Sequence, residues 1–232
     1  MSSLGPIRGA IFDLDGTLLD SNPFWEEAPE AWLRSVGTEP RPGTGKTVFA
    51  MTLPEAAEYL LAEYALPLSP EAIMDGVNAA MEAFYRTKAA LKPGAEALLC
   101  KLRARGLPLA IASVTDEPLV RTALRRHGLL EHFSHIVTTA EVGKGKREPD
   151  VYLLAAQKLG CSPRETLVFE DAPHGLQTAR RAGFVTVGVY DFANALRQEE
   201  LRAFADFYLP DFYDLTALLT ALDGWEKRAR RA

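Results

Sequence analysis

The stretch IFDLDGTLLDS, residues 11–21, holds the pattern from which the fold and the site of this chain can be predicted. An apolar run ends at Asp13, and a second carboxylate, Asp15, follows two positions later, directly before Gly16. Two acidic side chains this close together at the end of a strand repel each other, which costs stability. We therefore interpret the pair as part of a functional site that the remainder of the chain must complete.

The composition is typical of a soluble globular protein. The 232 residues can form one large domain, or a core with a small inserted domain. The formal net charge of −5 argues against a general nucleic-acid binder. The two cysteines, Cys100 and Cys161, match no metal or redox spacing and indicate a reducing compartment. No signal core and no membrane span is evident. We expect a cytoplasmic protein with no membrane or nucleic-acid partner, either a monomer or a weak dimer.

From residue 94 onward, apolar runs typical of strands alternate with patterns typical of helices. Helices are expected between the strands, and Thr115 is the expected N-cap of the one that begins near residue 116. Such alternation is typical of an α/β fold, with a parallel sheet covered by helices on both faces. The predicted strands are residues 7–12, 107–114, 133–139, 166–170 and 184–189, with a further edge strand near residue 210.

Residues 22–91 interrupt this alternation. Three stretches carry apolar residues at helical intervals and are separated by Pro or Gly, with no strand pattern between them. We predict an all-helical domain inserted between the first two strands, so that residues 1–21 and 92–232 form the core. The segment PGTGKT, residues 42–47, resembles part of a P-loop, but Pro40 replaces the first glycine and no strand precedes it. We interpret it as a loop of the inserted domain.

Several chemically active side chains follow the predicted strands at the point where each strand ends. In a parallel sheet these ends meet at one edge, where ligands bind. Four acidic groups crowded there would be costly without a cation, and an all-oxygen ligand set favours Mg²⁺. The residues concerned are Asp13, Asp15, Ser113, Lys146, Glu170 and Asp171.

A cation, a lysine and a hydroxyl beside an exposed carboxylate are typical of phosphoryl transfer. Asp13 can act as the nucleophile and form an aspartyl-phosphate. Lys146 and Ser113 would then neutralise or bind the phosphoryl oxygens. The second carboxylate, Asp15, can serve as acid and then as base, because a leaving alkoxide needs a proton that an ionised nucleophile does not supply.

Four motifs resemble those of the haloacid dehalogenase-like hydrolases, in the same order and in the same strand context. DLDGTLLDS resembles the first motif, and Ser113 matches the second. GKREPD resembles the third, with Lys146 as its lysine, and VFEDAPHG resembles the fourth. Arg147 departs from the pattern, since the family often has proline there. The resemblance covers essentially the whole chain.

The resemblance implies a Rossmann-like core and a helical cap of the C1 type, at residues 22–91. It implies Mg²⁺ held by Asp13, by the backbone carbonyl of Asp15 and by Asp171. Glu170 is expected to lie near the metal or to cap the following helix. The substrate or phosphate is expected to contact Ser113, Val114, Lys146 and Trp25.

Several functions within and outside this family remain open. Dehalogenases lack the second acid, and phosphonatases use a cap lysine whose motif does not match the surroundings of Lys46. The β-phosphoglucomutase branch carries a histidine near the position of Trp25 and an arginine in the cap loop. We predict a Mg²⁺-dependent phosphatase that acts on a small phosphorylated metabolite, of the sugar or nucleoside monophosphate type. A phosphosugar mutase and a non-catalytic phosphate-binding regulator are the alternatives.

Overall fold

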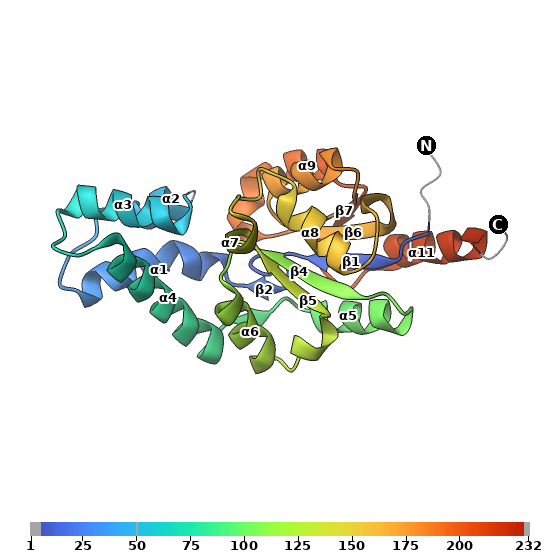
Figure 1. The fold of residues 1–232 in the computed structure, drawn as a ribbon, viewed down its shortest axis with the longest axis horizontal. Helices are drawn as coiled ribbons and strands as arrows, with labels where there is room; N and C mark the ends of the chain where they lie inside the picture. Colours follow the sequence, from blue (N-terminus) through green and yellow to red (C-terminus); the bar gives the residue numbers. More distant parts are fainter. Residues whose placement is uncertain (1–5, 50, 230–232) are drawn as a thin grey trace. The chain divides into compact units, whose positions relative to one another are not determined.

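The computed structural model describes residues 6–49 and 51–229. The described residues form a six-stranded sheet in the order β5-β4-β1-β6-β7-β8, in which all paired neighbours run parallel (Figure 1). The first strand, β1 (Gly9–Phe12), lies between β4 (Leu109–Ser113) and β6 (Thr166–Glu170). This order confirms the predicted α/β fold and places the carboxyl ends of three strands side by side.

The remaining strands extend the sheet on both sides. β5 (His135–Thr138) forms one edge, while β7 (Val185–Val189) and β8 (Phe207–Leu209) extend the other. The predicted edge strand is therefore β8, and Pro210 follows it. Several strands are shorter than predicted because residues at their ends do not pair with a neighbouring strand, and Thr139, predicted to end a strand, begins α7. A separate two-stranded antiparallel sheet pairs β2 (Leu19–Asp20) with β3 (Ala90–Leu91).

Helices cover both faces of the large sheet. Figure 1 shows α8 and α9 on one face and α5 and α6 on the other. The prediction that Thr115 caps α6 was wrong, because the N-cap position is Asp116. The helices of this part of the chain are α5 (Ala95–Ala104), α6 (Glu117–Arg126), α7 (Thr139–Val142), α8 (Asp150–Lys158), α9 (Pro173–Arg181), α10 (Gln198–Phe204) and α11 (Thr216–Ala229), with 3₁₀ turns η1 (Leu130–His132), η2 (Pro163–Glu165) and η3 (Phe192–Arg197).

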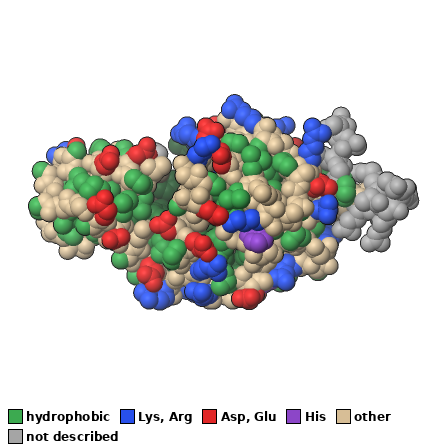
Figure 2. All heavy atoms as spheres, in the orientation of Figure 1, with side chains coloured by type: hydrophobic (Ala, Val, Ile, Leu, Met, Phe, Trp, Pro, Cys, Tyr) green, Lys and Arg blue, Asp and Glu red, His purple; other side chains and the backbone are tan. Residues whose placement is uncertain are grey.

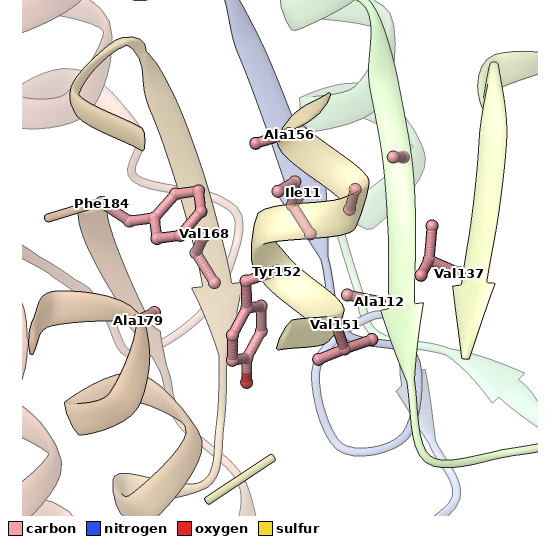
Figure 3. Packing of buried hydrophobic residues seen from close by; sticks show 11 residues of the cluster. Ile11, Ala112, Val137, Val151, Tyr152, Ala156, Val168, Ala179 and Phe184 are labelled. Carbon is pink, nitrogen blue, oxygen red and sulfur yellow. The ribbon is translucent and has the colours of Figure 1, made fainter. Parts of the chain in front are cut away.

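One buried apolar cluster joins α8 and α9 to the sheet. Figure 3 shows Ile11 and Val168, from adjacent strands, packed against Tyr152 of α8 and Ala179 of α9. Small side chains such as Ala156 let α8 approach the strands closely. Burial of these apolar side chains stabilises the sheet that carries the strand ends.

The chain divides into two compact units, one comprising Met1–Asp20 and Ala90–Ala232, the other Ser21–Ala89. In the second unit the described residues form helices joined by loops, without strands. Part of PGTGKT lies in α2, so the prediction of a loop there was wrong in part. Whether this unit acts as a cap stays a prediction. Its helices are α1 (Asn22–Ser35), α2 (Thr44–Phe49), α3 (Leu53–Tyr64) and α4 (Pro70–Thr87).

The helical unit has its own core, which includes Trp32, Leu60 and Ile73. At another position in this unit, the indole Nε1 of Trp25 donates a hydrogen bond to the hydroxyl of Tyr85 at 2.9 Å. Tyr85 is fully buried, so it belongs to the packing of this unit.

Figure 2 shows acidic and basic side chains interspersed over the visible face. Among the described residues, no helix combines the length and the apolar character that a membrane crossing requires.

We predict that Gly76→Ala destabilises the helical unit although alanine favours helix formation. A Cβ at Gly76 would lie 2.0 Å from Nε1 of Trp32, so α1 and α4 would have to separate. Such overpacking costs about 1–3 kcal/mol, more than the roughly 1 kcal/mol that alanine gains over glycine in a helix. Urea unfolding measures the difference. Ala79→Gly, at an exposed position of the same helix, calibrates helix propensity alone, and a Gly76→Ala protein as stable as the wild type would contradict the packing argument.

Candidate active site

The loop that follows β1 turns sharply and holds its two carboxylates at the end of the strand. The amide of Asp13 donates to the carbonyl of Phe169 in β6 at 3.0 Å, which continues the sheet pairing by one residue. Gly16 then adopts φ 83°, a conformation that glycine adopts without steric cost, and its amide donates to the carbonyl of Leu19 at 2.8 Å. This turn explains why glycine follows the second aspartate.

Three carboxylates meet beside the end of β1. Among the described residues, Asp13, Glu170 and Asp171 each place an oxygen within 4.8 Å of the others, and all three are buried. The pairing of β1 with β6 brings them together, because Asp13 follows one strand while Glu170 ends the other and Asp171 comes next. The predicted convergence of these residues is therefore present.

Lys146 reaches into this group from the loop before α8. Its Nζ donates to Oδ1 of Asp13 and, at 2.8 Å, to Oε2 of Glu170. The hydroxyl of Tyr152 donates to the same Oε2 at 2.9 Å. Tyr152 thus bridges two environments, since its ring packs in the apolar cluster of Figure 3 while its hydroxyl contacts the site.

The approach of α9 to these groups depends on a glycine. A Cβ at Gly175 would lie 2.8 Å from the hydroxyl oxygen of Tyr152 and 2.9 Å from Cδ of Glu170. Any side chain at this position would therefore disturb the carboxylate that pairs with Lys146. The glycine of the fourth motif thus keeps space for Glu170.

The three buried carboxylates place more negative charge at the site than the ammonium group of Lys146 can neutralise. Burial raises the pKa of Asp13 to about 7, although Lys146 opposes the shift. Burial, then the charges of Asp13 and Glu170, raise the pKa of Asp171 well above its usual range. Burial alone would lower the pKa of Lys146, but Asp13 and Glu170 outweigh it and raise this pKa.

Asp15 has a different environment from the three clustered acids. The hydroxyl of Thr115 donates to its Oδ2 at 2.7 Å. The amide of Thr115 in turn donates to the hydroxyl of Ser113 at 3.0 Å, at the end of β4. The second predicted carboxylate is therefore hydrogen-bonded toward β4, whereas Asp13 pairs with Lys146.

The remaining predicted residues differ in how the structure places them. Ser113 is fully buried at the strand end, while Val114 beside it is 58% exposed. Trp25 belongs to the helical unit and bonds to Tyr85, so its predicted contact with substrate stays a prediction. Glu170 contacts Lys146 and Tyr152, and its predicted proximity to a metal also stays a prediction.

Four residues at the site were not predicted from the sequence. Thr115 was recognised as a polar residue at the end of its strand, but it was interpreted as a helix cap. Tyr152 is hidden in the apolar pattern of its helix. Thr17, from the first motif, and Asn194, from the segment after β7, both donate to Asp171. Two of them had a usable signal, because Thr17 belongs to the first motif and Asn194 follows a strand whose carboxyl end lies at the same edge of the sheet.

The donor set at this edge fits a hard divalent cation. It offers carboxylate oxygens from Asp13 and Asp171, and these are the ligands that Mg²⁺ prefers. A cation bound there would stabilise their ionised forms and reverse the pKa shifts that burial causes.

Comparison with known proteins supports this interpretation of the site. The family model of haloacid dehalogenase-like hydrolases matches residues 7–183. Hexitol phosphatase A of Escherichia coli (strain K12) is 36% identical over 197 residues, which cover 84% of this chain and 88% of that protein. A Drosophila melanogaster protein named "Probable pseudouridine-5'-phosphatase" is 33% identical over 81% of this chain and 84% of its own length.

A solved structure shares the fold of this chain. The crystal structure of CbbY from Rhodobacter sphaeroides in complex with phosphate superimposes with a TM-score of 0.80 at 27% identity, covering 90% of this chain and 96% of that one. The family match, the two relatives and the motifs at the ends of β1, β4 and β6 agree. This chain belongs to the haloacid dehalogenase-like hydrolases.

Proposed function

We propose that this protein hydrolyses the phosphate monoester of a small metabolite through an aspartyl-phosphate at Asp13. The observation that carries the proposal is the position of the Asp13 carboxylate. It lies at the end of the central strand, paired with Lys146 and adjacent to two further buried acids. A carboxylate in this position is an oxygen nucleophile beside groups that can neutralise a phosphoryl group.

The reaction would proceed in two displacements at phosphorus. In the first, an oxygen of Asp13 bonds to phosphorus as the ester P–O bond breaks, and Asp15 donates a proton to the leaving oxygen. In the second, water attacks the aspartyl-phosphate, Asp15 takes a proton from it, and inorganic phosphate leaves with regeneration of Asp13. The Thr115 hydroxyl, 2.7 Å from Asp15, would orient this acid toward the leaving group.

Lys146 and Ser113 would bind the transferring phosphoryl group. The ammonium group of Lys146 is fixed by Glu170 and Tyr152, so its positive charge stays close to the nucleophile. Ser113 is the last residue of β4, the strand next to β1. Preorganised groups of this kind stabilise charge that develops in the transition state without having to move.

The family uses a divalent metal, and we propose that it is Mg²⁺ here. Asp13, Asp171 and the backbone carbonyl of Asp15 would hold it, with Glu170 in the neighbouring position. When bound, the cation supplies positive charge that offsets the charge of the phosphoryl oxygens. This assignment is supported by the three buried carboxylates and by the raised pKa of Asp13, which indicate that the site lacks positive charge.

The substrate class is supported by the names of relatives. Besides the hexitol and pseudouridine-5'-phosphate enzymes, a fructose-1-phosphate phosphatase of Escherichia coli is 31% identical over 78% of this chain. These names favour a sugar phosphate or a nucleoside monophosphate. That the protein works in the cytoplasm, as a monomer or a weak dimer, and without nucleic acid stays a prediction.

A phosphosugar mutase is the second candidate. Such an enzyme must hold a second phosphate while its aspartyl-phosphate survives, and an arginine in the cap is suited to that task. Residues 49–60 contain no arginine, and Trp25 takes the place of the histidine in the mutase branch. A non-catalytic regulator is disfavoured because the full set of Asp13, Asp15, Lys146 and Asp171 is intact.

We predict that inorganic phosphate appears in equal amount to the substrate consumed, when a panel of sugar phosphates and nucleoside monophosphates is assayed with Mg²⁺. EDTA should abolish the release and added Mg²⁺ should restore it, because the carboxylates need a cation to bind a phosphoryl group. Phosphate and product are quantified in the same sample. Conversion of β-glucose 1-phosphate to glucose 6-phosphate without phosphate release would establish the mutase instead.

We predict that Asp13→Asn lowers turnover by on the order of a thousandfold or more, since an amide cannot form the aspartyl-phosphate. The fold should survive, because removing one of three crowded carboxylates relieves repulsion within a buried group. Initial rates and the melting temperature test both statements. Near-normal turnover in this variant would exclude Asp13 as the nucleophile.

Asp15→Asn should distinguish substrates by their leaving group. Sugar phosphates, whose alkoxide needs a proton, should lose about 10²–10⁴-fold in rate. Aryl phosphates, whose phenolate leaves readily, should lose far less in the first displacement. The ratio of kcat/KM for the two substrate classes is the measurement, and equal losses on both would argue against Asp15 as the acid.

A further inference from the structure

Asp171, the residue after β6, accepts hydrogen bonds from the side chains of Thr17 and Asn194, which lie far from it in the sequence. The hydroxyl of Thr17 lies 3.4 Å from Oδ1, at the limit of a hydrogen bond. The amide Nδ2 of Asn194 donates to Oδ2 at 2.9 Å, a normal distance. Asn194 lies in η3, outside the four motifs and beyond the residues that the family model matches.

The backbone around Asn194 is held on both sides. Its amide donates to the carbonyl of Asp191 at 3.2 Å, and its carbonyl accepts from Nε2 of Gln198 at 2.9 Å. The hydroxyl of Tyr208, in β8, donates to Oε1 of Gln198 at 2.9 Å. Asn194 itself leaves the helical conformation, at φ −103° and ψ 18°. The sheet thus fixes the turn from which the amide reaches Asp171.

A buried ion pair fixes the beginning of the same turn. Asp191 is only 2% exposed, and its Oδ1 accepts from the amide of Ala193 at 3.0 Å, which caps η3. Its Oδ2 pairs with Nζ of Lys92 at 2.8 Å. Lys92 also donates to the carbonyl of Tyr190, so its ammonium group contacts both residues that follow β7, Tyr190 and Asp191. A buried charge pair with additional hydrogen bonds holds a single geometry.

We infer that Asn194 is a positioning residue for Asp171, which it holds in the orientation needed to bind the cation. A neutral amide suits this task. A lysine would neutralise the carboxylate and compete with the cation, whereas an amide satisfies one oxygen and leaves the negative charge in place. The inference rests on the proposed role of Asp171 as a cation ligand, and it does not depend on the identity of the substrate.

The test is the affinity of the purified protein for Mg²⁺ in the absence of substrate, measured by calorimetric titration. Asn194→Ala should weaken binding by about tenfold, in the range found when a partner of a metal ligand is removed. Its kcat at saturating Mg²⁺ should change much less than the Mg²⁺ concentration needed for half-maximal activity. Asn194→Ser, whose hydroxyl is too short to replace the amide, should show the same loss and serves as the second variant if Asn194→Ala folds poorly.

Leu196→Ala is the matched control, because this side chain of the same turn is fully exposed and neutral. It should bind Mg²⁺ as the wild type does. If the Asn194 variants keep the wild-type melting temperature and bind Mg²⁺ within twofold of the wild type, the positioning role is wrong. If the wild type itself binds no Mg²⁺, the cation site of the proposed function fails as well.

Discussion

The burial of three neighbouring carboxylates at the end of β1 is the constraint on which the rest of this site depends. Asp13, Glu170 and Asp171 are buried close to one another, and Lys146 pairs with Asp13 and Glu170. Burying uncompensated charge is costly, so this arrangement persists only because the surrounding fold holds it. The raised pKa of Asp13, about 7, reflects that cost. A cation bound there would offset this cost, so the proposed metal site and the ionisation of Asp13 would be linked.

The order of the strands makes this crowding possible. Because β1 is flanked by β4 and β6, the loop that follows it faces a serine on one side and two acids on the other. Each acid is then directed by its own donor. Asp15 accepts a hydrogen bond from Thr115. Glu170 accepts from Tyr152 and Lys146. Asp171 accepts from Asn194 and Thr17. Groups of the same chemical type can therefore take different roles, because each has a different environment.

Much of this architecture could be predicted from the sequence, because both the strands and the motifs are local patterns. The β6 strand was predicted with its observed bounds, and the convergence of Asp13 with Glu170 and Asp171 followed from the rule that parallel strands end at one edge. The errors share a cause. Thr115 satisfies the local rule for a helix cap, but its hydroxyl bonds to Asp15, a hundred residues earlier in the chain. Asn194 likewise acts across 23 positions. The partners in such contacts are set by tertiary packing, which local sequence patterns do not specify.

The difference in environment explains why the first motif carries two aspartates, Asp13 and Asp15. Two carboxylates with the same partners would have no physical basis for different roles. In this fold Asp13 faces Lys146 and the acids of β6, where a cation would keep it ionised. Asp15, one residue beyond Leu14, is turned toward β4, where the neutral hydroxyl of Thr115 adds no positive charge. A spacing of two residues therefore lets one turn, closed by Gly16, present two carboxylates with different partners, Lys146 for Asp13 and the Thr115 hydroxyl for Asp15.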